Sequence, residues 1–234
     1  YKNDNLIPAI KPNGFSVISI VGPSGAGKST VAAEIIRTNM RRTPALEDEE
    51  IEEKLAKMTK KEKKKFLMRN KDTQKIFLLS RQVSGKIDPA LEDLEKYIIH
   101  LNPSQGIEGL PELEDMEGSF VLIDDIEGLP NAQKEIVMEM VNMIATCGRK
   151  LAIKLIYSTH MLKGWVSRYI IAESQVVVFF PRSNSFLLKD LLRLKYCLKT
   201  SVINKILTNV KRDGSRVLFL RTNYPFFYAT SKRV

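Results

Sequence analysis

The chain has 234 residues, with 37 Lys and Arg against 27 Asp and Glu, so its formal net charge is +10. Its content of 44% hydrophobic and 27% charged residues excludes a disordered or collagen-like protein and favours a globular one. Only two cysteines and two histidines are present, too few for a disulfide framework, a cysteine zinc cluster or a histidine-rich metal site.

Membrane insertion and secretion are not expected. No apolar run approaches the roughly 20 residues that a membrane-spanning helix needs. Residues 1–5 are polar and lack the apolar segment of a signal peptide. Together with the cysteine usage, this predicts a soluble protein of a reducing, intracellular compartment. The basic excess indicates solubility or nucleic-acid binding about equally.

The first third of the chain predicts a strand, a helix and an insertion. A β-branched run over 15–21 indicates a buried strand, and apolar residues at helical spacing over 31–40 indicate a helix. Residues 41–72 carry an acidic run and then a basic one, which predicts a charged, helical and mobile insertion. A strand over 75–80 and a helix over 89–101 follow.

The rest of the chain continues the alternation of strands and helices. Strands are expected over 119–125, 151–158 and 175–180, and helices over 132–147, 162–171, 185–198 and 201–210. The last two segments, 216–220 and 225–229, predict a hairpin, and both cysteines fall in expected helices. This pattern predicts an α/β fold with a mostly parallel sheet flanked by helices, a small C-terminal β addition, and ligands at the carboxyl edge. We expect one domain over 1–234, with 41–72 inserted in it.

Residues 22–30 carry the clearest functional motif. They read GPSGAGKST, which fits the phosphate-binding loop (Walker A) without a gap, between an expected strand and an expected helix. The glycines let backbone N–H groups turn towards phosphate oxygens at a helix N-terminus. We expect Lys28 to reach the β- and γ-phosphates of ATP and the Ser29 hydroxyl to bind Mg²⁺. The expected nucleotide-binding residues are Gly22, Pro23, Ser24, Gly25, Ala26, Gly27, Lys28, Ser29 and Thr30.

Two adjacent carboxylates supply a second (Walker B) motif at the end of the strand over 119–125. We assign Asp124 to Mg²⁺ and Asp125 to the carboxylate that polarises the attacking water. A shared cation explains how both can stay ionised at a buried strand end. Glu127 is an alternative base, although its position is expected to turn it away. A purely structural interpretation has Asp125 capping the next turn.

The following strand ends in Ser158-Thr159-His160. We expect Thr159 and His160 to lie beside the aspartates, where they would sense the γ-phosphate or hold the lytic water, although a lone histidine is as often structural. Downstream, Arg168 or Arg182 could act as a finger on a neighbouring subunit's nucleotide. A solvated surface charge is the simpler interpretation of each arginine.

Together these motifs resemble one family, the viral genome-packaging ATPases of the FtsK–HerA superfamily, which occur in large DNA viruses and their virophages. The resemblance runs from Phe15 to the C-terminus. It rests on the phosphate loop, the strand ending in Asp-Asp, and then, in order, Ser158-Thr159-His160, Arg168, Glu173-Ser174, Phe179-Phe180-Pro181-Arg182, Arg216-Val217 and Tyr224-Pro225-Phe226.

The resemblance implies a RecA-like P-loop NTPase that forms a homo-oligomeric ring and pumps double-stranded DNA into a preformed capsid. It implies ATP and Mg²⁺, a capsid or portal-vertex partner, and a location at the viral assembly site in the host cytoplasm or in the virion. By its motifs, Lys28, Ser29, Asp124, Asp125, Thr159 and His160 would act at the nucleotide, with Arg168 as the leading trans finger. The second motif of related cellular pumps ends in Asp-Glu, so Asp125 departs from it, and 41–72 has no clear counterpart.

Other functions share parts of this pattern. The same phosphate loop occurs in guanylate kinases, but no compact nucleoside-monophosphate pocket is visible and such a kinase needs no Asp-Asp strand. A transporter-type ATPase would need a Leu-Ser-Gly-Gly-Gln signature, for which Val83-Ser84-Gly85-Lys86 is a poor substitute. A nucleotide-gated DNA-binding protein is the non-enzymatic alternative.

Overall fold

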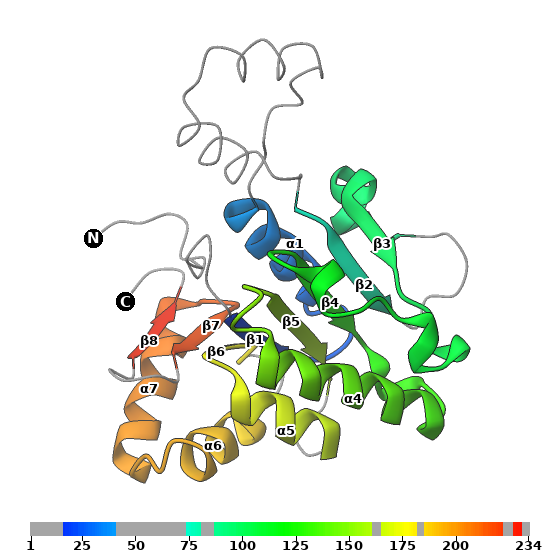
Figure 1. The fold of residues 1–234 in the computed structure, drawn as a ribbon. Coiled ribbons are helices and arrows are strands. Elements are labelled where there is room, and N and C mark those ends of the chain that lie inside the picture. The colour runs from blue at the N-terminus through cyan, green and yellow to red at the C-terminus, as the bar shows by residue number, and fades with distance from the viewer. Residues whose placement is uncertain are drawn as a thin grey trace, which may run out of the picture.

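A single eight-stranded sheet runs through the chain in the order β3-β2-β4-β5-β1-β6-β7-β8 (Figure 1). The computed structural model describes residues 16–40, 74–80, 87–160, 165–181, 185–221 and 227–230. The strands are β1 (Ser16–Val21), β2 (Ile76–Ser80), β3 (Ile98–His100), β4 (Phe120–Asp124), β5 (Lys154–Thr159), β6 (Val176–Phe179), β7 (Leu218–Arg221) and β8 (Phe227–Thr230).

The strands from β3 to β6 in this order are parallel, and β7 and β8 add to them in antiparallel fashion. This confirms the expected mostly parallel sheet and its small C-terminal β addition. The register pairs Val21 with Thr159 and Asp124 with Ser158. The ends of β1, β4 and β5 therefore meet at the carboxyl edge of the sheet, where α/β proteins bind ligands.

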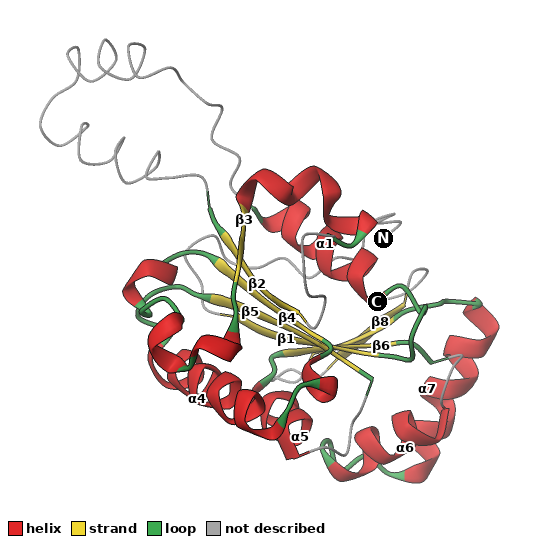
Figure 2. Ribbon diagram, turned by 90° about the vertical axis from the view of Figure 1, so that its right-hand side faces the viewer, coloured by secondary structure: helices red, strands yellow, loops and turns green. Residues whose placement is uncertain are grey.

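Helices cover both faces of the sheet (Figure 2). One face carries α1 (Lys28–Asn39) and a 3₁₀ helix, η1 (Pro89–Tyr97); the other carries α4 (Asn131–Cys147), α5 (Trp165–Glu173), α6 (Ser185–Leu194) and α7 (Thr200–Asp213). The short 3₁₀ turns are η2 (Pro103–Gln105), η3 (Ile107–Gly109), η4 (Glu114–Met116) and η5 (Ile126–Gly128). Because successive strand residues point to opposite faces, Ile18 and Ile20 of β1 pack on the α1 side and Val17 on the α4 side.

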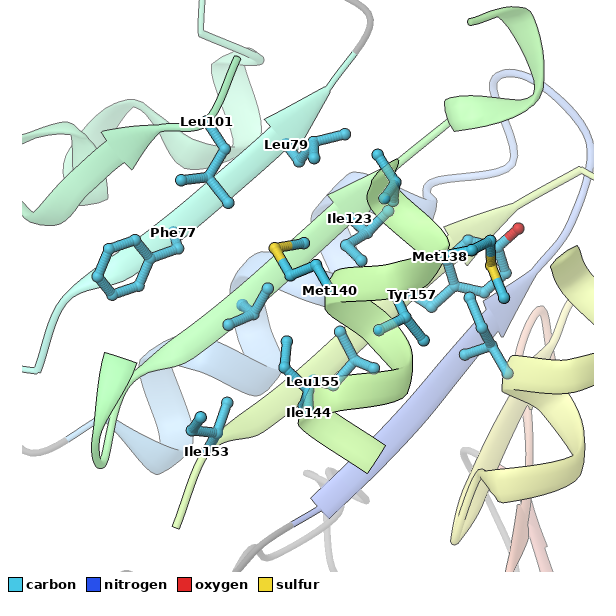
Figure 3. Packing of buried hydrophobic residues seen from close by; sticks show 14 of the residues in the cluster. Phe77, Leu79, Leu101, Ile123, Met138, Met140, Ile144, Ile153, Leu155 and Tyr157 are labelled. Atoms are coloured by element: carbon cyan, nitrogen blue, oxygen red, sulfur yellow. The ribbon is translucent and has the colours of Figure 1, made fainter. Parts of the chain in front are cut away.

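The core under α4 shows why these patterns fold as they do. Met140 and Ile144 of α4, at helical spacing, pack against Ile123 of β4 and Leu155 of β5 (Figure 3). Each of the four is at most 1% exposed. Full burial of such a side chain stabilises the fold by about 1.5–3 kcal/mol, so this layer fixes β4 and β5 against α4 below their carboxyl ends.

Two local predictions were wrong. The segment expected as one helix over 89–101 forms η1 and then β3. The start of η1 has two common helix-start signals: Pro89 is in its first turn, and the Asp88 side chain accepts a hydrogen bond from the Ala90 N–H. It ends at Tyr97 because the next residues pair in parallel with β2. Cys197 lies beyond α6 rather than within it, with a backbone φ of 50°.

Some expectations fall outside the described residues. These are the insertion over 41–72, Arg182, and the segments 83–86 and 224–226. Within the ranges that the structure does describe, no helix is both long and apolar enough to cross a membrane.

Candidate active site

The phosphate loop connects β1 to the first residue of α1, which is Lys28. Gly27 precedes the helix with a φ of 98°, a left-handed backbone that a side chain would strain. At Gly22 the constraint is steric, since a Cβ there would lie 2.7 Å from Cδ2 of Phe180. The loop therefore needs glycine for its backbone turn at one end and for close packing against Phe180 at the other.

Lys28 is buried, with 7% of its surface exposed. Its Nζ donates to the carbonyl oxygen of Pro23 at 3.2 Å and lies 3.1 Å from Nδ1 of His160. Burial lowers the pKa of Lys28, and the negative charges of Asp125, Asp124 and Glu127 act in the opposite direction. The structure thus brings the loop lysine into the field of the carboxylates at the end of β4.

Asp124 lies on the α1 side of the sheet, because it follows Phe120 and Leu122 in the alternation of β4 and both of these pack on that side. Burial raises the pKa of its carboxyl group, and the neighbouring charge of Asp125 adds to the rise. Lys28 lowers that pKa without cancelling the rise. In the protein without a ligand, the positive charge near Asp124 is therefore too small to offset the cost of ionising its carboxyl group.

Asp125 leaves the strand in a left-handed conformation, with φ 54° and ψ 46°. Its side chain makes no capping hydrogen bond to η5. Instead its Oδ1 lies 2.8 Å from Nε2 of His160. The turn thus directs Asp125 towards the end of β5, and not into the cap that the structural interpretation required.

His160 joins the two motifs. With its proton on Nε2, the ring donates to the Asp125 carboxylate while Nδ1 accepts from Lys28. Nδ1 also lies 3.2 Å from the Gly22 carbonyl oxygen, a partner that a doubly protonated ring would donate to instead. The contact of Nδ1 with the loop is therefore to Lys28 when Nδ1 carries no proton and to the Gly22 carbonyl oxygen when it does.

Thr159 points to the opposite face of the sheet from His160. Its hydroxyl donates to Oε1 of Glu127, which also accepts from the Tyr157 hydroxyl at 3.1 Å and the Ser167 hydroxyl at 3.5 Å. η5 places the Glu127 carboxylate against Thr159, on the face of the sheet opposite to His160. Oε2 of Glu127 is buried and makes no hydrogen bond within the described part of the chain.

The structure brings Lys28, Asp124, Asp125 and His160 together, and separates Thr159 and Arg168 from them. Arg168 is exposed on α5, one residue after Ser167. The sequence analysis did not identify Tyr157 and Ser167, whose hydroxyls hydrogen-bond to Glu127. These contacts depend on how α5 lies against β5, and no sequence motif indicates them.

A divalent cation would need help from a nucleotide here. In the described ranges, no group of three or more His, Cys, Asp and Glu is arranged to hold a metal by itself. The oxygen donors present, the Ser29 hydroxyl and the Asp124 carboxylate, are of the type that Mg²⁺ prefers when phosphates and water complete its shell. The raised pKa of Asp124 fits this, since a cation would favour its ionised form.

No protein-family model matches the chain. A protein of Sputnik virophage, described as uncharacterized protein V3, is 26% identical over 238 residues, covering 97% of this chain and 81% of that protein. Among solved structures, the genome packaging NTPase B204 of Sulfolobus turreted icosahedral virus 2, in complex with AMPPCP, is 12% identical with a TM-score of 0.47, covering 96% of this chain and 100% of that chain. The cytoplasmic domain of the type VII secretion ATPase EccC of Thermomonospora curvata is 12% identical with a TM-score of 0.49, covering 94% of this chain and 25% of that chain. The P-loop fold is established by the strand order and loop of this chain itself.

Replacing Asp124 with Asn should increase the free energy of unfolding of the nucleotide-free protein at about pH 7, by about 0.5–2 kcal/mol. The folded-state pKa of Asp124 lies above its unfolded value of 3.8, so the native protein loses stability as the pH rises through the folded-state pKa. The Asn amide is never ionised, so its burial does not carry this pH-dependent cost. The difference in stability between the two proteins should vanish at pH values below the unfolded-state pKa of Asp124. Urea denaturation across this range measures it, with the exposed Glu139→Gln as control. A less stable Asn variant at neutral pH would contradict the argument.

Proposed function

We propose that this protein is an ATP hydrolase that drives double-stranded DNA into a preformed viral capsid as a ring-shaped motor. The observation that carries the proposal is the contact of loop lysine, histidine and strand-end aspartate, Lys28–His160–Asp125. A virophage relative, covering 97% of this chain, supports a viral setting. In this proposal the whole chain is one P-loop domain, with 41–72 as an insertion in it.

The nucleotide would lie against the loop of residues 22–30, with its phosphates at the N-terminus of α1. Lys28 would release Pro23 and His160 and donate to the β- and γ-phosphates. Ser29 and Asp124 would hold Mg²⁺, which when bound neutralises charge on the phosphates. Asp124 gains from this arrangement because its ionised form is otherwise penalised by burial.

Asp125 is the proposed base for the attacking water. It is partly exposed, with 43% of its side chain accessible, so a water molecule can reach it. His160 orients the carboxylate by donating from Nε2, and would report on the nucleotide because Nδ1 loses Lys28 when that lysine moves to phosphate. Thr159 and Glu127 have a different proposed role, which is to tie the end of β5 to α5.

Removing the carboxylate of Asp125 tests this division of roles. Asp125→Asn should lower kcat for ATP hydrolysis by about 10²–10⁴-fold, the range that a general base contributes, and Lys28→Ala should abolish measurable hydrolysis. Glu127→Gln should lose far less, because its hydroxyl partners can still hydrogen-bond to an amide oxygen. Phosphate release with Mg²⁺ and duplex DNA measures all three. A larger loss in Glu127→Gln would transfer the role of base to that residue, and GMP-dependent ADP production without DNA would indicate a nucleotide kinase.

The proposed ring places Arg168 of one subunit against the nucleotide of its neighbour. The support is its exposure on α5, the helix whose Ser167 hydroxyl contacts Glu127 beyond the end of β4. Such a finger accelerates turnover by about 10³–10⁵-fold where it exists.

Subunit mixing tests the trans arginine. Arg168→Ala subunits keep an intact loop, and Lys28→Ala subunits keep the arginine, so a mixture should recover part of the ATPase activity that each lacks alone. The exposed Arg149→Ala, mixed in the same way, is the control and should be fully active by itself. Absence of recovery at every mixing ratio would remove the assignment.

A packaging motor must bind DNA of any sequence, so its contacts should go to phosphates. Affinity for duplex DNA should fall with salt, with a log–log slope of about −0.9 per phosphate neutralised. Fluorescence anisotropy with two unrelated duplexes, from low to physiological salt, gives both the slope and the sequence dependence. A salt-independent affinity, or a strong preference for one duplex, would count against the motor.

A further inference from the structure

The positive charge of the chain is concentrated in its final segment. Residues 181–234 contain 12 Lys and Arg but only two Asp and no Glu, whereas residues 1–180 contain 25 basic and 25 acidic residues. The formal net charge of +10 therefore comes entirely from the final segment. Such asymmetry within a chain indicates a surface for a polyanion, a nucleic acid or an anionic membrane.

The helix α7 presents one row of polar side chains to the outside. Its buried residues share one side of the helix: Ile203, Ile206, Leu207, Val210 and Asp213. The opposite side carries exposed cations and hydroxyls: Ser201, Lys205, Thr208 and Arg212. These four follow at spacings of four, three and four residues, which places them on one line along the helix. With a rise of 1.5 Å per residue, the row extends over about 16 Å.

The helix α6 adds two cations to the same surface. Lys189 and Arg193 are exposed and lie one turn apart, while the neighbouring Leu188 and Leu192 are fully buried. α6 and α7 pack side by side into one core on the same face of the sheet (Figures 1 and 2). Because each helix turns its buried side to this core, the exposed cations of both helices point away from the sheet.

The two acids of this segment are withdrawn from the surface. Asp213 is 4% exposed and accepts a hydrogen bond from the Thr230 hydroxyl at 3.1 Å, and Asp190 is half-buried. Along the described positions of α6 and α7, every exposed charged side chain is therefore basic. Like charges on successive turns of a helix repel one another, and a bound polyanion would remove that cost.

We give the name basic face to the outward row of α7 together with the two cations of α6: Lys189, Arg193, Ser201, Lys205, Thr208 and Arg212. We propose that the phosphate backbone of duplex DNA lies on this face. Lysine, arginine, serine and threonine are the side chains that contact DNA phosphates. The inference rests on the proposed function, to which it adds the surface that receives the DNA.

An anionic membrane fits the basic face less well than DNA does. A helix that lies on a membrane inserts its apolar side among the lipids. The apolar side of α7 is already buried against the sheet and α6. The row that α7 exposes is therefore suited to phosphates that approach from outside and stay in water, as those of a duplex do.

Neutralising two cations of α7 tests the inference. Lys205→Gln with Arg212→Gln removes two phosphate contacts, so the log–log slope of DNA affinity against salt should become shallower by about 1.8. Over a fourfold rise in salt, the native chain should then lose about 10-fold more affinity than this variant. Fluorescence anisotropy with one labelled duplex, titrated at several salt concentrations, measures the slope of each protein.

Two matched variants serve as controls. Arg149→Gln with Lys150→Gln makes the same change of charge at exposed positions outside the basic face, and should keep the native slope. Lys205→Arg with Arg212→Lys keeps both charges on the face and should keep the slope as well. Circular dichroism and thermal denaturation show whether each variant folds like the native chain.

The possible outcomes separate this inference from the proposed function. If Lys205→Gln with Arg212→Gln keeps the native slope, the basic face does not bind DNA, and the motor proposal stands with its DNA contacts elsewhere. If the variant instead loses flotation with phosphatidylserine vesicles, the face is a membrane surface. A change in its sedimentation coefficient would make the face a subunit interface and would also overturn the inference. A native chain without affinity for duplex DNA would overturn both proposals together.

Discussion

The alignment of parallel strands at one edge of the sheet underlies the rest of the molecule. β4, β5 and β1 are neighbours in the sheet, and backbone hydrogen bonds continue past their ends: Gly22 N–H donates to the Thr159 carbonyl at 3.1 Å and Asp125 N–H to the Ser158 carbonyl at 3.2 Å. These bonds hold the phosphate loop, the end of β5 and the acidic turn in one register. This register brings the backbones at Lys28 and His160 close enough for the two side chains to touch, although the residues are far apart in the sequence.

The charges gathered at this edge are costly in the protein alone. Burial opposes the ionised forms of both Lys28 and Asp124, lowering the pKa of the lysine and raising that of the acid. A triphosphate and its divalent cation would supply the opposite charges that each side chain lacks, so ligand binding would relieve a cost that folding imposes. Binding sites often combine low intrinsic stability with strong ligand preference for this reason.

The end of β5 divides two roles between adjacent residues. His160 faces the loop and α1, while Thr159 faces Glu127 and, through it, Ser167 on α5. Strand alternation makes this division unavoidable, because consecutive side chains point to opposite faces. A shift at the end of β5 would therefore be felt on both sides of the sheet, at the phosphate loop and at the helix that carries Arg168.

Local sequence patterns determined the phosphate loop, the Asp-Asp strand end, the alternation of strands and helices, and the final hairpin, because each depends on residues close together in the chain. Only the tertiary structure decided that residues 98–100 leave their helix to pair with β2, that η5 returns Glu127 to Thr159, and that His160 bridges Lys28 and Asp125. These outcomes depend on which strands become neighbours, a long-range choice made by the burial of whole faces and by backbone pairing, which no local spacing records.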